Sequence, residues 1–262
     1  MASTLTLPNA LAQYRRGSVL EHEFAPFEAL VNHVRQDRVE RWVDIEDEFI
    51  RLVGLFDTEF ARGSGDGNDG WYQSKARCFS ELLAGLLGNT SGNPISLRCK
   101  KRSQLFDLVD IDICFPREGD PIVAGEVKTL GMPGHGENEN TASEFANDLH
   151  RSVREVAFSS MDLKAAYAPP RPIGSFQNWV DATSPGYFAF WAIRAKDRQD
   201  FEEVRSTLAS SRAYCNGVGA VIYVPSKPGT PTEYGVRKAA DLSIDRVVKE
   251  MAQRIASSLA AP

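Results

Sequence analysis

Residues 108–130 have the sequence LVDIDICFPREGDPIVAGEVKTL, and the predicted fold depends on this stretch. In its first half, Asp110 and Asp112 alternate with branched apolar residues. A period of two places both carboxylates on one face of a β-strand. Residues 116–121 include two prolines, a glycine and an aspartate, a composition typical of a loop between antiparallel strands. The stretch therefore predicts a β-hairpin.

The second half repeats the period of two, so Glu126 and Lys128 point to the same face. A turn centred near Gly119 sets Asp112 opposite Glu126. The same register sets Asp110 opposite Lys128, and a shift of one or two residues is the alternative. Like charges that face each other across a ladder destabilise it. We therefore expect a cation between them, and Mg²⁺ suits the site because it prefers carboxylate oxygens and keeps several waters.

Asp112, followed after a hairpin-length gap by Glu126-Val127-Lys128, resembles the PD-(D/E)XK nuclease superfamily, which has the restriction-endonuclease-like fold. An apolar β-branched residue stands before each aspartate, where the family has proline. The resemblance implies an α/β fold with a central mixed β-sheet flanked by helices. It also implies that Asp112, Glu126 and the backbone carbonyl of Val127 bind Mg²⁺ and that Lys128 positions or helps to deprotonate the attacking water.

A plain surface hairpin is the competing interpretation. In it, Asp110 pairs with Lys128 across the strands and the other acidic residues are solvated. Because this explains Asp110 well, we prefer Asp112 as the metal ligand and keep Asp110 as its substitute.

Composition limits the possible partners and compartment. The chain has 262 residues, a net charge of −5 and four widely spaced cysteines without a Cys-X-X-Cys pair. Any phosphate-binding surface must be a local basic cluster on an acidic body. Neither a zinc ribbon nor a disulfide scaffold is expected. The absence of a signal-peptide pattern and of a membrane-length apolar run predicts a soluble, cytoplasmic protein.

We expect two regions. Residues 1–62 form an N-terminal helical region, since two apolar stripes recur there at helical spacing. Residues 61–70 are rich in glycine and small polar side chains and mark a junction. Residues 71–262 form the nuclease-like core.

The core begins with a helix over residues 71–87, whose one acid, Glu81, either completes the metal site or is solvated. A strand over 95–105 follows and carries the densest basic cluster of the chain, namely Arg98, Lys100, Lys101 and Arg102. These side chains either contact phosphates or protect an edge strand from aggregation.

Downstream of the hairpin, His135 lies in a glycine-rich loop that would overhang the site and contact phosphate or a base, although a lone loop histidine is often incidental. Thr141 and Glu144 form a capping box that opens a helix. Arg151 lies beside the apolar stripe of this helix and is a candidate for nucleic-acid binding or for a solvated face. Prolines in 169–184 predict an interruption of regular structure.

Apolar runs at 187–195 and 217–224 predict strands covered by helices on both faces, and 241–259 predicts a final amphipathic helix. The chain lacks a Walker phosphate loop, a His-Glu-X-X-His helix and a Gly-X-Ser-X-Gly elbow.

We therefore expect a Mg²⁺-dependent endonuclease acting on double-stranded DNA, most similar to a type II restriction endonuclease of prokaryotic defence. Cutting both strands needs two sites and hence a homodimer. The alternatives are a non-cleaving module that binds nucleic acid or protein with a nuclease-like fold, and a defence nuclease activated by a signal.

Overall fold

The computed structural model describes residues 25–62, 68–131, 139–167, 176–182, 184–226 and 233–260. The helices are α2 (Ala25–Gln36), α3 (Glu46–Arg62), α4 (Asn68–Ser91), α5 (Glu139–Tyr167), α6 (Phe176–Ala182), α7 (Arg198–Ser210) and α8 (Ile244–Ala260). The strands are β1 (Ser96–Arg102), β2 (Leu108–Phe115), β3 (Val123–Leu130), β4 (Gly186–Arg194), β5 (Gly217–Pro225) and β6 (Tyr234–Arg237). Single 3₁₀ turns are η1 (Trp42–Asp44), η2 (Ser211–Ala213) and η3 (Ala240–Leu242).

The strands form one sheet in the order β1-β2-β3-β4-β5-β6. β1, β2 and β3 are antiparallel neighbours, β3, β4 and β5 run parallel, and β6 is antiparallel to β5. The predicted class, an α/β protein with a central mixed sheet, flanking helices and an N-terminal helical region, is confirmed.

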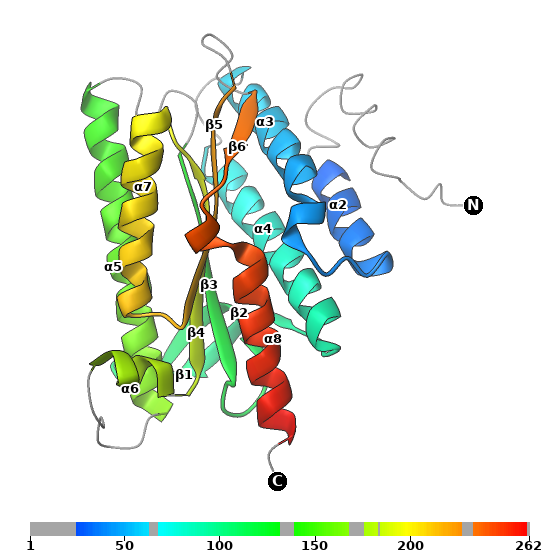
Figure 1. Cartoon of the computed structure of the whole chain (residues 1–262), viewed down its shortest axis with the longest axis vertical. Coiled ribbons are helices and arrows are strands. Elements are labelled where there is room, and N and C mark those ends of the chain that lie inside the picture. Colours follow the sequence, from blue (N-terminus) through cyan, green and yellow to red (C-terminus); the bar gives the residue numbers. More distant parts are fainter. Residues whose placement is uncertain are drawn as a thin grey trace.

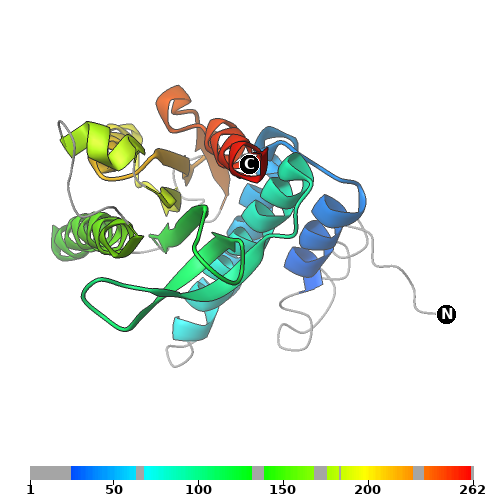
Figure 2. The ribbon, with the colours of Figure 1, turned by 90° about the horizontal axis from the view of Figure 1, so that it is seen from below.

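Helices cover both faces of the sheet (Figure 1). α5 and α7 lie on one face, while α4 and α8 lie on the other; α3 lies beside α4 and β6, and α2 lies beyond α4 (Figures 1 and 2). Along β4, Phe188 and Phe190 belong to the core on the α4 and α8 side, and Tyr187 and Trp191 belong to the core on the α5 side. This double burial explains why the β4 sequence is continuously apolar.

The N-terminal helices share a core with the sheet. Trp42 and Phe49 pack on Phe79 of α4 with ring centroids 5.4 and 5.3 Å apart, and these residues join Val127 of β3 in one buried cluster. The described part of the expected N-terminal region, residues 25–62, therefore shares its core with the sheet.

Two elements were not predicted. α6 lies inside 169–184, where prolines predicted an interruption of regular structure, and residues 168–175 lie outside the described ranges. β6 has only four residues and was not predicted, since so short an edge strand carries little periodicity. Within the described ranges, no helix is both long enough and apolar enough to cross a membrane.

Candidate active site at the β2–β3 fork

β2 and β3 pair over a short distance and then separate. The paired residues are Ile113 with Gly125, Cys114 with Ala124 and Phe115 with Val123. This is the predicted register, in which Asp112 is the next residue opposite Glu126. Beyond these pairs β2 continues along β1, and β3 continues along β4. We call the opening between the two strands the β2–β3 fork.

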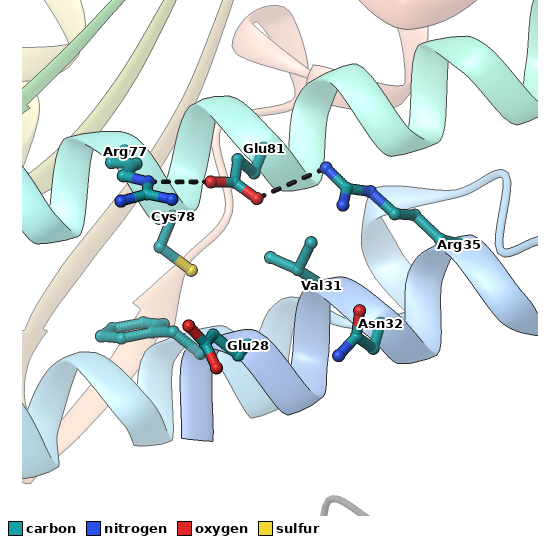
Figure 3. A pocket seen from close by; sticks show the side chains of 8 residues that line it. Glu28, Val31, Asn32, Arg35, Arg77, Cys78 and Glu81 are labelled. Atoms are coloured by element: carbon teal, nitrogen blue, oxygen red, sulfur yellow. Dashed lines mark hydrogen bonds and ion pairs between the residues drawn. The ribbon is translucent and has the colours of Figure 1, made fainter. Parts of the chain in front are cut away.

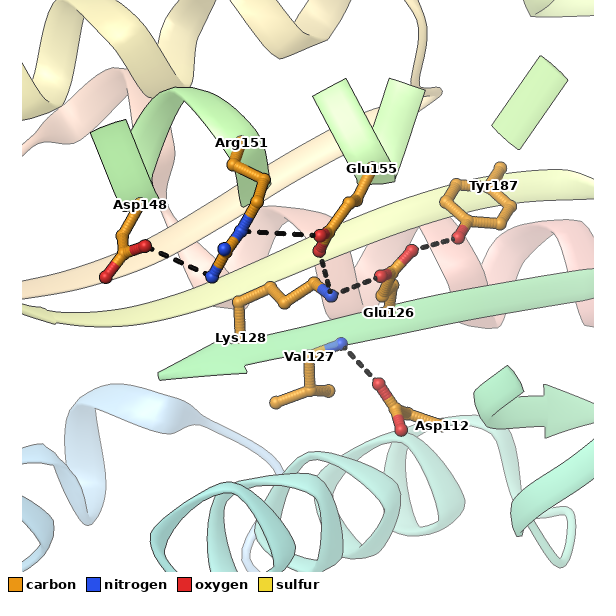
Figure 4. Close-up of polar contacts among 8 residues, drawn as sticks. All are labelled: Asp112, Glu126, Val127, Lys128, Asp148, Arg151, Glu155 and Tyr187. Atoms are coloured by element: carbon orange, nitrogen blue, oxygen red, sulfur yellow. Dashed lines mark hydrogen bonds and ion pairs between the residues drawn. The ribbon is translucent and has the colours of Figure 1, made fainter. Parts of the chain in front are cut away.

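Asp112 fills the fork with its side chain. Its Oδ2 accepts a hydrogen bond from the backbone N–H of Val127 at 2.8 Å, replacing the acceptor that a paired strand would supply (Figure 4). The N–H and C=O of a strand residue point to the same edge. The carbonyl of Val127 therefore also faces the fork.

Burial raises the pKa of the Asp112 carboxyl, and the negative charge of Glu126 adds to this effect. The hydrogen bond from Val127 and the positive charges of Lys128 and Arg98 oppose it. Arg98 has a φ of +52° and lies at the break in the β1–β2 pairing opposite Asp112.

Glu126 and Lys128 project from the same face of β3, as their alternation predicted, and this face is turned toward Glu155 of α5 (Figure 4). Lys128 Nζ lies 2.8 Å from Glu126 Oε1 and 3.1 Å from Oε2 of Glu155 on α5. The hydroxyl of Tyr187 on β4 donates a hydrogen bond to Glu126 Oε2 at 2.6 Å. Both oxygens of Glu126 are therefore engaged.

Charge, rather than burial, decides the state of Lys128. Burial alone would lower its pKa, but the charges and hydrogen bonds of Glu126 and Glu155 outweigh burial and raise it. Lys128 is thus an ammonium at neutral pH. Tyr187 stays a neutral donor, because burial and the adjacent carboxylate raise its pKa far above the usual range.

The fork offers oxygen donors of the kind that Mg²⁺ prefers. One oxygen of Asp112 has no hydrogen bond to the described residues and the carbonyl of Val127 faces the same opening, whereas both oxygens of Glu126 are engaged by Lys128 and Tyr187. Mg²⁺ is commonly held by one or two carboxylates with water and substrate oxygens. Across the described ranges no three acidic, histidine or cysteine side chains form a cage.

Asp110 lies on the exposed face of the hairpin arm, and its strand partner is Lys100 rather than Lys128. The expected pairing of Asp110 with Lys128 is wrong, because β2 and β3 have separated at this point. Asp112 is the aspartate that the structure brings beside the Glu-X-Lys strand.

Glu81 is not brought to the fork. Its carboxylate contacts Arg77 at 2.9 Å and Arg35 at 3.3 Å, and it lines a cavity of about 330 Å³ between α2 and α4 (Figure 3). The apolar face of α4, which includes Leu82 and Leu83, packs into the core instead, so Glu81 points toward α2.

The side chains of the basic cluster lie on two faces of β1, one buried and one exposed. Lys101 is buried, and its Nζ donates hydrogen bonds to the carbonyls of Pro116, Arg117 and Gly119 at 2.7–3.0 Å. Its expected role in phosphate binding is wrong, because all three donors serve the β2–β3 turn.

Arg98, Lys100 and Arg102 are exposed. Arg102 lies over the ring of Tyr167 and donates a hydrogen bond to the Ala166 carbonyl at 2.6 Å. Arg151 is exposed on α5 and reaches Asp148 at 3.1 Å and Glu155 at 3.7 Å (Figure 4). His135 lies outside the described residues.

Sequence reasoning missed Glu155 and Tyr187. Glu155 follows Arg151 by four residues, so it shares a face with a residue already proposed for the site. Tyr187 pairs with Ala124 across β3 and β4, which places it on the face of Glu126, two residues along. The contacts of Glu155 with Lys128 and of Tyr187 with Glu126 are not visible until the packing of α5 and β4 is known.

Comparisons with family models, with curated proteins and with solved structures found no match to the chain. The site is therefore interpreted from its own chemistry.

Proposed function

We propose that the protein is a Mg²⁺-dependent endonuclease that hydrolyses phosphodiester bonds in double-stranded DNA. The observation that carries the proposal is the β2–β3 fork, where the carboxylate of Asp112 enters beside the strand that bears Glu126 and Lys128. Phosphodiester cleavage needs carboxylate oxygens for a hard cation and a positive group near the phosphate.

The roles follow from these contacts. Asp112, Glu126 and the carbonyl of Val127 would hold Mg²⁺, which supplies a bound water of lowered pKa and neutralises charge on the phosphate. Lys128 orients the attacking water and offsets negative charge, because its raised pKa keeps it an ammonium. Tyr187 fixes the rotamer of Glu126 through its hydrogen bond.

Within this activity we favour a sequence-specific type II restriction endonuclease of prokaryotic defence that works in the cytoplasm. Cleavage of both strands of a duplex needs two sites, so a homodimer is the expected assembly. Exposed Lys100 and Arg151 would contact phosphates on an otherwise acidic chain.

The test is cleavage of a panel of plasmid and phage DNA in the presence of Mg²⁺. We expect discrete fragments from the wild type and none from Asp112→Ala or Lys128→Ala. Asp110→Ala is the matched control, since Asp110 lies two residues away on the exposed face of the same strand, and it should cut as the wild type does. Cleavage that survives Asp112→Ala would refute the assignment of the site.

The engaged state of Glu126 favours two further candidates, a fold that binds without cutting and a nuclease that needs a signal to open the site. In both cases no DNA is cut without a signal, yet Mg²⁺ still raises the melting temperature of the wild type by binding the folded state. Glu126→Gln should abolish this increase whether or not DNA is cleaved.

A further inference from the structure

A group of large apolar side chains is exposed next to the candidate site. It consists of Leu105, Phe106, Leu108, Phe158 and Met161, which are between 40% and 65% exposed. The rings of Phe106 and Phe158 contact each other with centroids 6.2 Å apart. We call these five residues the aromatic platform. Contiguous exposed apolar surface of this kind marks a binding site more often than an accident of folding.

The platform is continuous with the charged site along α5. Glu155, which contacts Lys128, precedes Phe158 by three residues, and Arg151 precedes Glu155 by four. Residues at these spacings are neighbours on a helix surface. Phe158 therefore lies one helical turn from Glu155, the residue of α5 that contacts Lys128.

The β1–β2 turn that carries Phe106 is held in place by hydrogen bonds. Asp162 of α5 accepts hydrogen bonds from the backbone N–H of Gln104 at 3.0 Å and of Leu105 at 2.8 Å, and from the hydroxyl of Ser103. The Ser103 hydroxyl in turn accepts one from the N–H of Phe106 at 2.9 Å. The exposed ring is thus displayed on an ordered turn, and this preorganisation favours binding.

The charges around the platform favour nucleic acid as the partner. Arg154, four residues before Phe158, is exposed, as is Lys100 on β1. Arg151 on the same helix is exposed and shared with Asp148 and Glu155, and the exposed Asp107 is the one acidic residue between Phe106 and Leu108. Cations beside exposed aromatic rings are the combination that binds unpaired nucleotides, with the rings stacking on bases and the cations contacting phosphates. A protein partner fits less well, because stable protein interfaces use about 20–30 residues a side. The aromatic platform has only its five defined residues.

Resting on the proposed function, we infer that the aromatic platform stacks an unpaired base beside the scissile phosphate. In the proposed double-stranded substrate, this base would come from a segment that is opened at the point of cutting. Such a base would lie on Phe106 and Phe158 while the adjoining phosphate approaches Lys128.

The test measures binding without Mg²⁺, so that it is independent of cleavage. Fluorescence anisotropy would compare a labelled single strand, a blunt duplex and a duplex with a single-stranded gap. We expect tight binding of the single strand and the gapped duplex. Phe106→Leu combined with Phe158→Leu should weaken both by about tenfold or more, because leucine keeps apolar surface but cannot stack.

Two controls sharpen the experiment. Leu259→Ala removes an equally exposed apolar side chain on α8 and should leave all affinities unchanged. Phe158→Trp keeps a stacking ring and should bind at least as tightly as the wild type. All replaced side chains are exposed, so equal melting temperatures will confirm that the variants fold.

Unchanged binding in the double leucine variant overturns the inference. So does a wild-type dimer that becomes a monomer on Phe106→Ala and Phe158→Ala, because the platform would then join two copies of the chain. If DNA is cut but the platform variants cut it equally well, the inference fails and the nuclease stands. If the gapped duplex is bound through the platform and never cut, the nuclease fails and the binding site stands.

Discussion

Asp112 places a carboxylate where a β-ladder usually has a backbone acceptor. Burying this carboxylate lowers the stability of the folded protein by an amount that can be measured. Burial raises its pKa above the ordinary value of 3.8. The folded protein therefore holds a proton on Asp112 more readily than the unfolded chain does. Stability must fall as the pH rises between the unfolded and the folded pKa.

Asp112→Asn tests this directly, because asparagine keeps an oxygen for the Val127 N–H and removes the buried charge. We expect the variant to melt at a higher temperature than the wild type at pH 7. The difference should shrink as the pH falls below 3.8, where the wild-type carboxyl is protonated in both states. Thermal melts across this pH range give the answer, with exposed Asp110→Asn as the control. A lower melting temperature for Asp112→Asn at pH 7 would show that the charge stabilises the fold.

At the scale of the element, the β2–β3 turn depends on a lysine from the neighbouring strand. The ammonium of Lys101 donates hydrogen bonds to three backbone carbonyls of the turn. Replacing it leaves these acceptors without their charged donor in a buried position. Hydrogen bonds of this kind contribute about 1.5–3 kcal/mol each to stability, and losses within one group do not add fully.

Lys101→Met should therefore lower the free energy of unfolding by about 2–4 kcal/mol in urea titrations. Lys100→Met, on the adjacent exposed position, should change it by less than about 0.5 kcal/mol. The opposite ranking is expected for DNA affinity under the proposed function, in which the exposed charge of Lys100 contacts phosphate. Equal stability of the two variants would contradict the assigned role of Lys101.

At the scale of the whole molecule, a buried polar group joins the N-terminal helices to the far edge of the sheet. Asp57 of α3 pairs with Lys75 of α4 and accepts a hydrogen bond from the hydroxyl of Tyr234 on β6 at 2.6 Å. Asp57 and Lys75 are 1% and 6% exposed. Removing one partner of such a pair leaves an uncompensated buried charge.

Asp57→Ala should destabilise the protein by about 3–5 kcal/mol. Because the N-terminal helices and the sheet share one core, we also expect a single unfolding transition, with tryptophan fluorescence and far-ultraviolet circular dichroism coinciding. Asp44→Asn, which breaks an exposed ion pair with Arg41, should have no measurable effect. Two separate transitions would instead support independent regions at 1–62 and 71–262.

The sequence predicted most of the sheet because its strands have strong patterns. The alternation around Asp112 and Glu126 gave the hairpin and its register, and the apolar run of β4 indicated burial on both faces. The same alternation separates Lys101 from Lys100, but a basic cluster without a known fold does not show which face of β1 is covered. β6 is too short to show a period.

The candidate site was predictable only where its residues share one hairpin. Glu155 contacts Lys128 from 27 positions away in the sequence, and Tyr187 contacts Glu126 from 61 positions away. Their part in the site depends on how α5 and β4 pack against β3. The prediction that Glu81 completes the metal site was wrong for the same reason. The helix pattern shows the apolar face of α4 but does not show which element lies next to its polar face.

One backbone amide at the fork depends on a side chain for its hydrogen bond. The N–H of Val127 is protected from solvent protons by a side chain, Asp112, rather than by a second strand. If Asp112 turns to a cation, or is removed, that amide alone loses its acceptor while the amides of the paired part of β3 keep theirs. The hydrogen-exchange rate of a single residue therefore reports on the occupancy of the site without any substrate.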